Sequence, residues 1–369
     1  MASSLFDRLI WRSTRQVYLL SRRAFARRKV VALDPSADVE RILLIRTDKI
    51  SDAVISTAFF KALRARCPNA QIDIVLGRKN GVAASLLSYL DGTFVVKKNL
   101  IEQMRLIRQL RERRYDVAVD MLTGDSMTAA TYALLSGADI TIGFDGKKSG
   151  LYDISIARPT EPEHQAVQML RLIAPLGVSM KPGDVRTTVA FPQSAARGVR
   201  EKLFPAEDRD RHKLIVINLS VDPARYWTDE KFIRLVGDIK SPSVRVALIA
   251  APGDLARLET IGKAAEVEWL PPATDISETA ATLSCADLVI SAGTSIVHIA
   301  AALDKPVVTL MASAAAKGEW YPLGVPYRAL HCATCVADIP YDDVLAAVRE
   351  LMAEAGFAKQ VPLTDGILA

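Results

Sequence analysis

The stretch from Arg41 to Arg66 constrains the fold more than any other part of the chain. Its first six residues, Arg41-Ile-Leu-Leu-Ile-Arg46, form the short apolar run typical of a strand buried on both faces. A polar turn follows, Thr47-Asp-Lys-Ile-Ser-Asp52, and then small and apolar residues recur at three- and four-residue steps, which predicts a helix. A strand, a tight turn and a helix in this order predict a parallel α/β sheet that binds ligands at its carboxyl edge.

Asp52 lies at the point where the turn becomes the helix. A carboxylate there can cap the helix by accepting a hydrogen bond from a backbone amide, or it can face the cleft and act as a base. The residues alone leave both interpretations open.

The same alternation of strands and helices runs through most of the chain and favours two α/β domains, which suits a length of 369 residues. In the first half we expect strands at about 41–46, 71–76, 94–97, 116–121 and 139–143, and helices at about 50–66, 80–90, 99–113, 126–136 and 163–177. In the second half we expect strands at 213–218, 244–250, 286–291 and 306–311, and helices at 228–239, from 254, 275–284, 294–303 and 341–355.

A connection rich in proline and charged residues separates the two halves. The expected organisation has five parts: a basic amphipathic leader helix over 1–39, an N-terminal domain over 40–185, a linker over 186–212, a C-terminal domain over 213–356 and a tail over 357–369.

Positive charge is concentrated in the leader. Residues 1–30 carry eight basic residues and one acid, a net charge of +7, whereas the whole chain has +5 and the remainder therefore −2. This balance argues against a general nucleic-acid surface. Residues 4–28 mix arginines with leucine, phenylalanine, tryptophan and tyrosine, which is typical of a helix lying on an anionic membrane. A solvated or docked basic helix and an organellar transit peptide are the alternatives.

The four cysteines indicate a reducing compartment. They are few and irregularly spaced, which argues against a disulfide framework. Cys332 and Cys335 supply only half of a zinc site, so we predict a structural loop there and no metal. No apolar run approaches the roughly 18–20 residues that a spanning helix needs, and we expect no secretory signal.

A turn in the second half has the features of a phosphate site. Gly293, Thr294 and Ser295 follow a strand and open a helix, so they place free backbone amides at a helix N-terminus, which attracts phosphate. An ordinary turn that binds nothing is the alternative. His298, one turn further on, either hydrogen-bonds a phosphate or sugar or is a core histidine.

Two other strand ends point to the same edge of the sheet. Ser220 offers a hydroxyl, and Arg225 offers a fork suited to a diphosphate, unless it is a plain surface arginine. Together with the turn at Thr294 and Ser295 they predict one diphosphate site. Asp254 follows the next strand, where we expect a ribose contact.

In combination these segments resemble glycosyltransferase family 9, the heptosyltransferase-type enzymes of bacterial lipopolysaccharide. The opening strand and turn, with Ser51-Asp52, are similar to the family's apolar strand, polar turn and Gly-Asp. The resemblance covers about residues 40–350. Further similar segments are Phe144 after Ile142-Gly143, the His164 helix, Arg225-Tyr-Trp, the run from Asp287 to Val308, Tyr321-Pro-Leu-Gly-Val-Pro-Tyr-Arg328 and Cys332-Ala-Thr-Cys335.

The resemblance implies a GT-B fold, in which two Rossmann-like doubly wound domains face each other across a cleft. The nucleotide-sugar donor would bind the C-terminal half and a glycan or lipid-linked acceptor the N-terminal half. The implied reaction is an inverting, metal-independent transfer of a heptose or related sugar, without a cofactor and with Asp52 as the general base. Ser220, Arg225, Thr294 and Ser295 would stabilise the departing diphosphate. The implied location is cytoplasmic and peripheral, at the inner face of the cytoplasmic membrane.

Departures from the family pattern keep a second class of function open. Ser51 replaces a glycine, Arg225 replaces a lysine, and Gly293 stands where the family usually has an aspartate that touches the donor sugar. A catalytically silent glycan- or nucleotide-binding protein with the same fold is therefore the alternative. An NAD-dependent oxidoreductase is disfavoured, because the turn at 46–53 contains no Gly-x-Gly-x-x-Gly.

Overall fold

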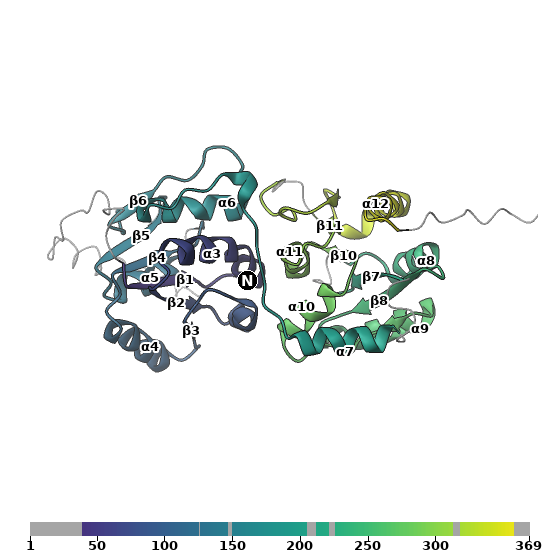
Figure 1. The fold of residues 1–369 in the computed structure, drawn as a ribbon, viewed down its shortest axis with the longest axis horizontal. Helices are drawn as coiled ribbons and strands as arrows, with labels where there is room; N and C mark the ends of the chain where they lie inside the picture. The colour runs from purple at the N-terminus through teal and green to yellow at the C-terminus, as the bar shows by residue number, and fades with distance from the viewer. Residues whose placement is uncertain are drawn as a thin grey trace, which may run out of the picture.

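The computed structural model describes residues 39–124, 126–146, 150–204, 212–220, 226–312 and 318–357. Within these ranges the chain forms two α/β domains that lie side by side (Figure 1). The predicted membrane segment, residues 4–28, and the predicted diphosphate ligand Arg225 lie outside the described residues.

The N-terminal domain is built on a six-stranded parallel sheet with the order β3-β2-β1-β4-β5-β6. The chain leaves β1 on one side towards β2 and β3 and returns on the other side at β4, so the order reverses between β1 and β4. Ligands of doubly wound sheets bind at such a switch point. The strands are β1 (Arg41–Arg46), β2 (Gln71–Leu76), β3 (Gly92–Val95), β4 (Val117–Asp120), β5 (Ile140–Phe144) and β6 (Ile154–Ile156).

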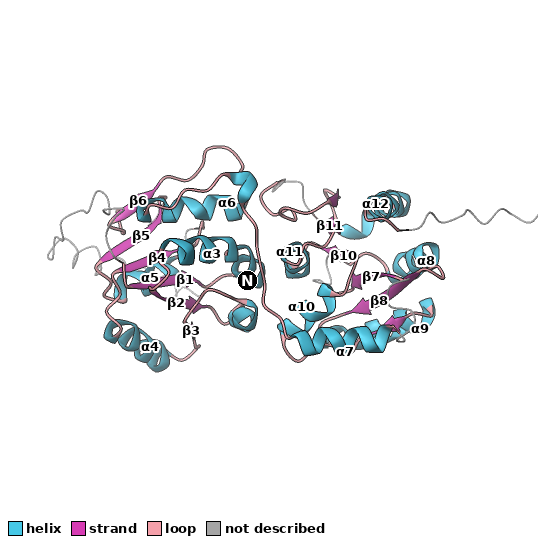
Figure 2. Ribbon diagram, in the orientation of Figure 1, coloured by secondary structure: helices cyan, strands magenta, loops and turns pink. Residues whose placement is uncertain are grey.

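Helices cover both faces of this sheet (Figure 2). Alternate strand residues point to opposite faces, so Leu43 and Ile45 pack with α4 and α5, whereas Ile42 and Leu44 pack with α2, α3 and α6. This explains the unbroken apolar run of β1. The helical segments are α2 (Ile50–Ile55), α3 (Thr57–Arg66), η1 (Gly81–Leu86), α4 (Leu100–Glu112), α5 (Met127–Leu135), α6 (Gln165–Leu170), η2 (Arg171–Leu176) and η3 (Pro182–Asp184).

The C-terminal domain repeats the same plan, with the parallel order β12-β11-β10-β7-β8-β9 and a switch point between β7 and β10. Its strands are β7 (Lys213–Asn218), β8 (Val244–Ile249), β9 (Glu268–Trp269), β10 (Leu288–Ala292), β11 (Val307–Met311) and β12 (Tyr327–His331). Its helical segments are α7 (Gln193–Leu203), α8 (Asp229–Ile239), η5 (Pro252–Asp254), α9 (Leu255–Ala265), α10 (Ile276–Ser284), α11 (Ser295–Ala302), η6 (Val336–Asp338) and α12 (Tyr341–Glu354).

The predicted α/β class of two parallel sheets is confirmed, and several predicted elements are corrected. The single helix expected over 50–66 is interrupted at Ser56, whose hydroxyl donates to the Asp52 carbonyl, 2.6 Å away. The helix expected at 80–90 is only the short 3-10 segment η1. Helix α7 was not expected; it lies within the predicted linker and packs on α10. Strands β6, β9 and β12 were also missed.

The two domains meet through packed elements as well as through the connecting chain. Val54 of α2 and Leu86 of η1 belong to the same buried cluster as Ile296 and Val297 of α11. The segment before β12 crosses back to the N-terminal domain, where the Glu319 carbonyl accepts from the Gln165 amide at 3.0 Å. These contacts bring the carboxyl end of β1 close to the N-terminus of α11.

Gly143 provides a test of the N-terminal core. A Cβ at this position would lie 2.3 Å from the Tyr152 ring, whose hydroxyl donates to the buried Asp120. Because the ring must move and the hydrogen bond is lost, we expect Gly143→Ala to lower the free energy of unfolding by about 2–4 kcal/mol. Chemical denaturation measures this.

Gly237→Ala on α8 is the matched control, because a Cβ there meets nothing within 4 Å. Alanine should raise stability at this helical position by about 0.5–1 kcal/mol. Equal stability of the two variants would contradict the described packing of Tyr152.

Candidate functional site

The two switch points are each bridged by a buried polar side chain from the last residue of the central strand. Arg46 ends β1, and its Nη1 donates to the Met121 carbonyl beyond β4 at 2.7 Å. Asn218 ends β7, and its Nδ2 donates to Ser291 Oγ on β10 at 3.0 Å. Arg46 is 1% exposed and Asn218 is 3% exposed. In each sheet a buried polar side chain therefore links the two strands on either side of the switch point, at the edge where ligands of this fold class bind.

Arg46 holds two carboxylates of the turn that follows β1. Its Nη2 lies 3.3 Å from Asp52 Oδ1, and its Nη1 lies 3.2 Å from Asp48 Oδ2. Its Nε also donates to the Asp52 carbonyl at 3.2 Å. We call Arg46, Asp48 and Asp52 the Arg46 cluster. The cluster thus sets two carboxyl groups against one guanidinium.

Asp52 takes the capping role that the sequence allowed. Its Oδ2 accepts from the Lys49 amide at 3.0 Å, at the start of α2. The residue is 4% exposed, so its carboxylate is turned inward to the turn and Arg46, while its neighbours Ile50 and Ser51 line the space between the domains. The predicted role of Asp52 as a base stays a prediction.

Asp48 is a candidate that the sequence reasoning missed. Its side chain is 28% exposed, and burial raises its pKa to about 6, with Arg46 opposing and Asp52 adding to the rise. Among the described residues, its Oδ1 has no hydrogen-bond partner. Asp48 is thus the more accessible carboxylate of the Arg46 cluster, and its pKa suits proton exchange near neutrality. The sequence signal that could have identified Asp48 is its position just after β1.

The N-terminus of α11 stands between two cavities on the other side of the cleft. The larger, of about 670 Å³, lies between the domains and is lined by Lys49 and Lys79 from one side and by Thr294 and His298 from the other. The smaller, of about 410 Å³, is lined mainly by the C-terminal domain. Ile50, Thr294 and Ser295 line both. The structure thus brings the predicted phosphate turn into the cleft, with two lysines that the sequence reasoning did not single out.

His298 lines the larger cavity but is itself buried. Burial lowers its pKa to about 3, with a smaller contribution from His164, and its ring meets Trp320 edge to face, with centroids 6.2 Å apart. His164 belongs to the N-terminal domain, and its Nε2 donates to the Tyr321 carbonyl at 3.0 Å. Because His298 is neutral at physiological pH, it can offer a hydrogen bond to a ligand but no positive charge.

Ser220 and Asp254 form a pair at the ends of β7 and β8. The Ser220 hydroxyl donates to Asp254 Oδ2 at 2.7 Å and accepts from the Ala251 amide. Asp254 also accepts from the Tyr226 hydroxyl at 2.9 Å. Ser220 lines the smaller cavity. The structure therefore brings Ser220 together with Thr294 and Ser295, and uses Asp254 to orient it.

Arg257 on α9 fixes both ends of the segment that carries Arg225. Its Nη1 donates to the Leu219 carbonyl at 2.6 Å and its Nη2 to the Trp227 carbonyl at 3.2 Å. Trp227 is fully buried, and its Nε1 donates to the Ile339 carbonyl at 3.1 Å. The tryptophan of the Arg225-Tyr-Trp motif is thus a core anchor.

The departures at Ser51 and Gly293 are sterically mild. Ser51 is absent from the described residues with positive φ, so its turn does not require glycine. A Cβ at Gly293 would meet its nearest neighbour, Met311 Cγ, at 3.7 Å, an ordinary contact. The backbone at position 293 therefore leaves room for a Cβ.

The Cys332 loop is held by local hydrogen bonds. Cys332 Sγ lies 3.2 Å from Thr334 Oγ1, and Cys335 Sγ accepts from the Ala337 amide at 3.2 Å, where it caps η6. The described part of the chain contains no group of three or more His, Cys, Asp or Glu side chains placed to hold a metal ion. In the same ranges, no helix has the length and apolar character needed to span a membrane.

Comparison with known proteins assigns this arrangement to a family. The model of glycosyltransferase family 9 (heptosyltransferase) matches residues 103–336, and the chain belongs to that family. It is thus a glycosyltransferase of the heptosyltransferase type, from a family with homologues in lipopolysaccharide biosynthesis.

Individual relatives are distant. The chain is 22% identical to lipopolysaccharide heptosyltransferase 3 of Escherichia coli K12 over 334 residues, which cover 82% of this chain and 95% of that protein. The family 9 glycosyltransferase of Veillonella parvula has 16% identity and a TM-score of 0.72, covering 87% of this chain and all of that one. The Escherichia coli heptosyltransferase WaaC with ADP has 18% identity and a TM-score of 0.67, covering 84% and 99%. These structures confirm the GT-B-like fold.

Asp48 gives the site a pH-dependent signature. Its pKa is about 6 in the folded protein against 3.8 in the unfolded chain, so the folded state binds more protons between these values. The contribution of Asp48 to stability is therefore present below pH 4 and is lost as the pH rises through about 6, a change of about 2–3 kcal/mol.

Asp48→Asn removes this titration. We expect the difference in unfolding free energy between variant and wild type to shift in favour of the variant as the pH rises through this window. Denaturant titrations at a series of pH values measure it. If the difference in unfolding free energy between variant and wild type is the same below pH 4 and above pH 6, the pKa of Asp48 is not raised.

Proposed function

We propose that this protein transfers a heptose or related sugar from a nucleotide-diphosphate donor to a lipopolysaccharide-core or similar glycan acceptor, with inversion at the anomeric carbon. The observation that carries the proposal is the meeting of two unlike groups in one cleft. Residues 49–51, which stand in the chain between Asp48 and Asp52 of the Arg46 cluster, line a cavity whose opposite wall is the N-terminus of α11. A proton acceptor on one side and donors for a leaving diphosphate on the other are what such a transfer requires.

The two neighbouring cavities, which share Ile50, Thr294 and Ser295, suggest how the donor binds. A nucleoside fits the smaller cavity, the diphosphate lies at Thr294 and Ser295, and the sugar extends into the larger cavity between the domains. Backbone amides at the start of α11, together with Lys49, Lys79 and Arg225, neutralise the diphosphate, and this removes the need for a metal ion. The related WaaC structure contains ADP, which favours an adenine nucleotide.

The chemistry follows from these positions. The acceptor hydroxyl oxygen attacks the anomeric carbon, the bond from that carbon to the diphosphate oxygen breaks, and the hydroxyl proton passes to a carboxylate. We assign this proton to Asp52, the aspartate that the family resemblance favours. Asp48 is the second candidate, because it is the more exposed of the two and burial raises its pKa to about 6.

The acceptor and the place of the reaction are further parts of the proposal. A lipid-linked acceptor is presented at the inner face of the cytoplasmic membrane, and the basic leader segment 4–28 holds the enzyme there.

A catalytically silent binding protein is the competing function, favoured by Gly293. Calorimetry with ADP, UDP and GDP, followed by assays of the matching sugar nucleotides, separates the two. Nucleotide binding without turnover on any acceptor would favour the silent protein.

Replacing each carboxylate in turn shows whether Asp52 or Asp48 is the base. If Asp52 accepts the proton, Asp52→Asn lowers kcat by about 100-fold or more while nucleotide affinity persists, because a positioned base contributes about that factor. Asp48→Asn then lowers kcat only modestly. The reverse ranking, measured by transfer assays at saturating donor, would assign the base to Asp48.

Gly293→Asp tests the role of that position in donor recognition. A Cβ at this position makes only ordinary contacts, so we expect the unfolding free energy to stay within about 1 kcal/mol of the wild type. If the new carboxylate accepts a hydrogen bond from a sugar hydroxyl, kcat/KM for the donor should rise by about tenfold. An unchanged kcat/KM would show that position 293 does not contact the donor sugar. Gly237→Ala is the control.

A further inference from the structure

Helix α4 carries an exposed apolar patch that the fold does not use. The helix packs on the sheet through Leu106 and Leu110, whereas Leu100, Ile101 and Met104 are 70%, 60% and 63% exposed. In the described part of the chain the other exposed large apolar side chains are Val82, at 56%, and Leu255, at 39%. Three of the five therefore lie within the first five residues of one helix. Exposed apolar patches of this kind mark interaction surfaces.

Basic side chains surround these apolar residues. Ile101, Met104, Arg105 and Arg108 stand three, four and seven residues apart, so they lie on one outward stripe of α4. Lys97 and Lys98 are exposed just before the helix begins. Residues 97–114 hold seven basic residues and two acids, a net charge of +5, in a chain whose total is also +5.

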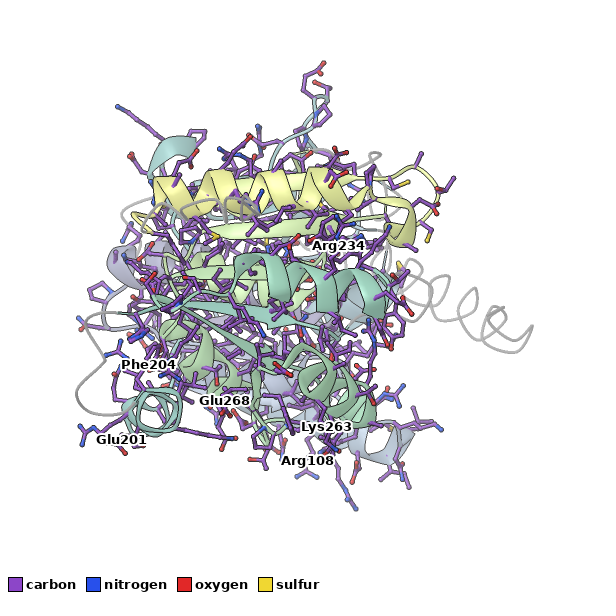
Figure 3. All side chains as sticks on the ribbon, turned by 90° about the vertical axis from the view of Figure 1, so that its right-hand side faces the viewer. Arg108, Glu201, Phe204, Arg234, Lys263 and Glu268 are labelled. Carbon is purple, nitrogen blue, oxygen red and sulfur yellow. The ribbon has the colours of Figure 1, made fainter. Side chains whose placement is uncertain are left out.

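The surface continues onto the second domain. Helix α7 carries three basic residues and one acid, a net charge of +2. In Figures 1 and 3, α4 and α7 both lie along the lower side of the molecule, where the labelled Arg108 and Glu201 stand. Two basic helices, one from each domain, thus lie on this side of the molecule, and α4 carries the apolar patch.

We propose that this side docks on an anionic lipid bilayer, with Leu100, Ile101 and Met104 entering the interface and the surrounding lysines and arginines contacting lipid headgroups. Aliphatic side chains flanked by cations are the pattern of an interfacial helix. Because like charges repel, the net charge of +7 over residues 1–30 argues against the leader as the occupant of this surface. This docking would be a second membrane contact, made by the folded domains, in addition to the contact proposed for the leader. It does not depend on the transfer chemistry.

The test measures lipid partition coefficients of the full chain by titrating vesicles, either containing phosphatidylglycerol or made of phosphatidylcholine alone. The variants are Ile101→Gln/Met104→Gln and Arg105→Gln. Arg349→Gln is the matched control, an exposed arginine on α12, which lies on the opposite flank (Figure 1). Each variant is checked for an unchanged thermal transition and for transfer to an acceptor in detergent.

We expect Arg105→Gln to weaken binding to the anionic vesicles about fivefold, since one basic residue near such a surface contributes about that factor. The apolar double variant should weaken it at least as much, and should remain weak in high salt, whereas Arg349→Gln binds like the wild type. Equal binding by all variants would overturn the proposal, because the leader alone would then carry the attachment.

Two other results would also overturn it. If only Arg105→Gln binds less, the surface is merely basic and the apolar patch does not enter the bilayer. If the apolar variant instead changes the oligomeric state and leaves vesicle binding intact, a second copy of the chain covers the patch. Vesicle binding that is lost while transfer in detergent persists would support the docking and leave the proposed function standing.

Discussion

The structure of the N-terminal half depends on one buried guanidinium. Arg46 is almost fully removed from water at the switch point of its sheet, and an isolated charge in that place would cost several kcal/mol. It is tolerated because it bonds to Met121, to the Asp52 backbone and to the carboxylates of Asp48 and Asp52. These contacts of Arg46 fix the conformation of the turn after β1 and the direction in which α2 leaves that turn. The same contacts bury the Asp48 carboxyl group beside Asp52; burial raises the pKa of Asp48, and the neighbouring acid adds to the rise.

The C-terminal half closes its switch point without charge. Asn218, Ser291 and Thr294 form a chain of neutral hydrogen bonds at the start of α11. This leaves the backbone amides and the positive end of the helix dipole as the local field. The two halves share one fold and carry opposite chemistry, carboxylates on one side and anion-binding donors on the other. Contacts between α2 and α11 hold these unlike edges together.

Some of this was predictable from the sequence and some was not, for physical reasons. The strand, turn and helix around Asp52 follow from local periodicity, and so does the helix expected at 294–303, which is α11. The raised pKa of Asp48 depends on burial by distant segments, which no spacing reveals. Helix α7 escaped notice because it buries only Ala196 and Leu203 along its length. His298 could be read as a ligand or as core, and only its packing against Trp320 shows that it is both buried and beside the cavity. Arg225 lies outside the described residues, and its role stays a prediction.

The central claim is that the two switch points form a single site. The most direct measurement is a crystal structure of the protein with ADP bound. The account predicts the adenosine in the cavity beside Ser220 and the diphosphate at the Thr294 and Ser295 amides, with Lys49 and Lys79 facing it from the other domain. A diphosphate bound away from the start of α11, with neither lysine near it, would contradict it.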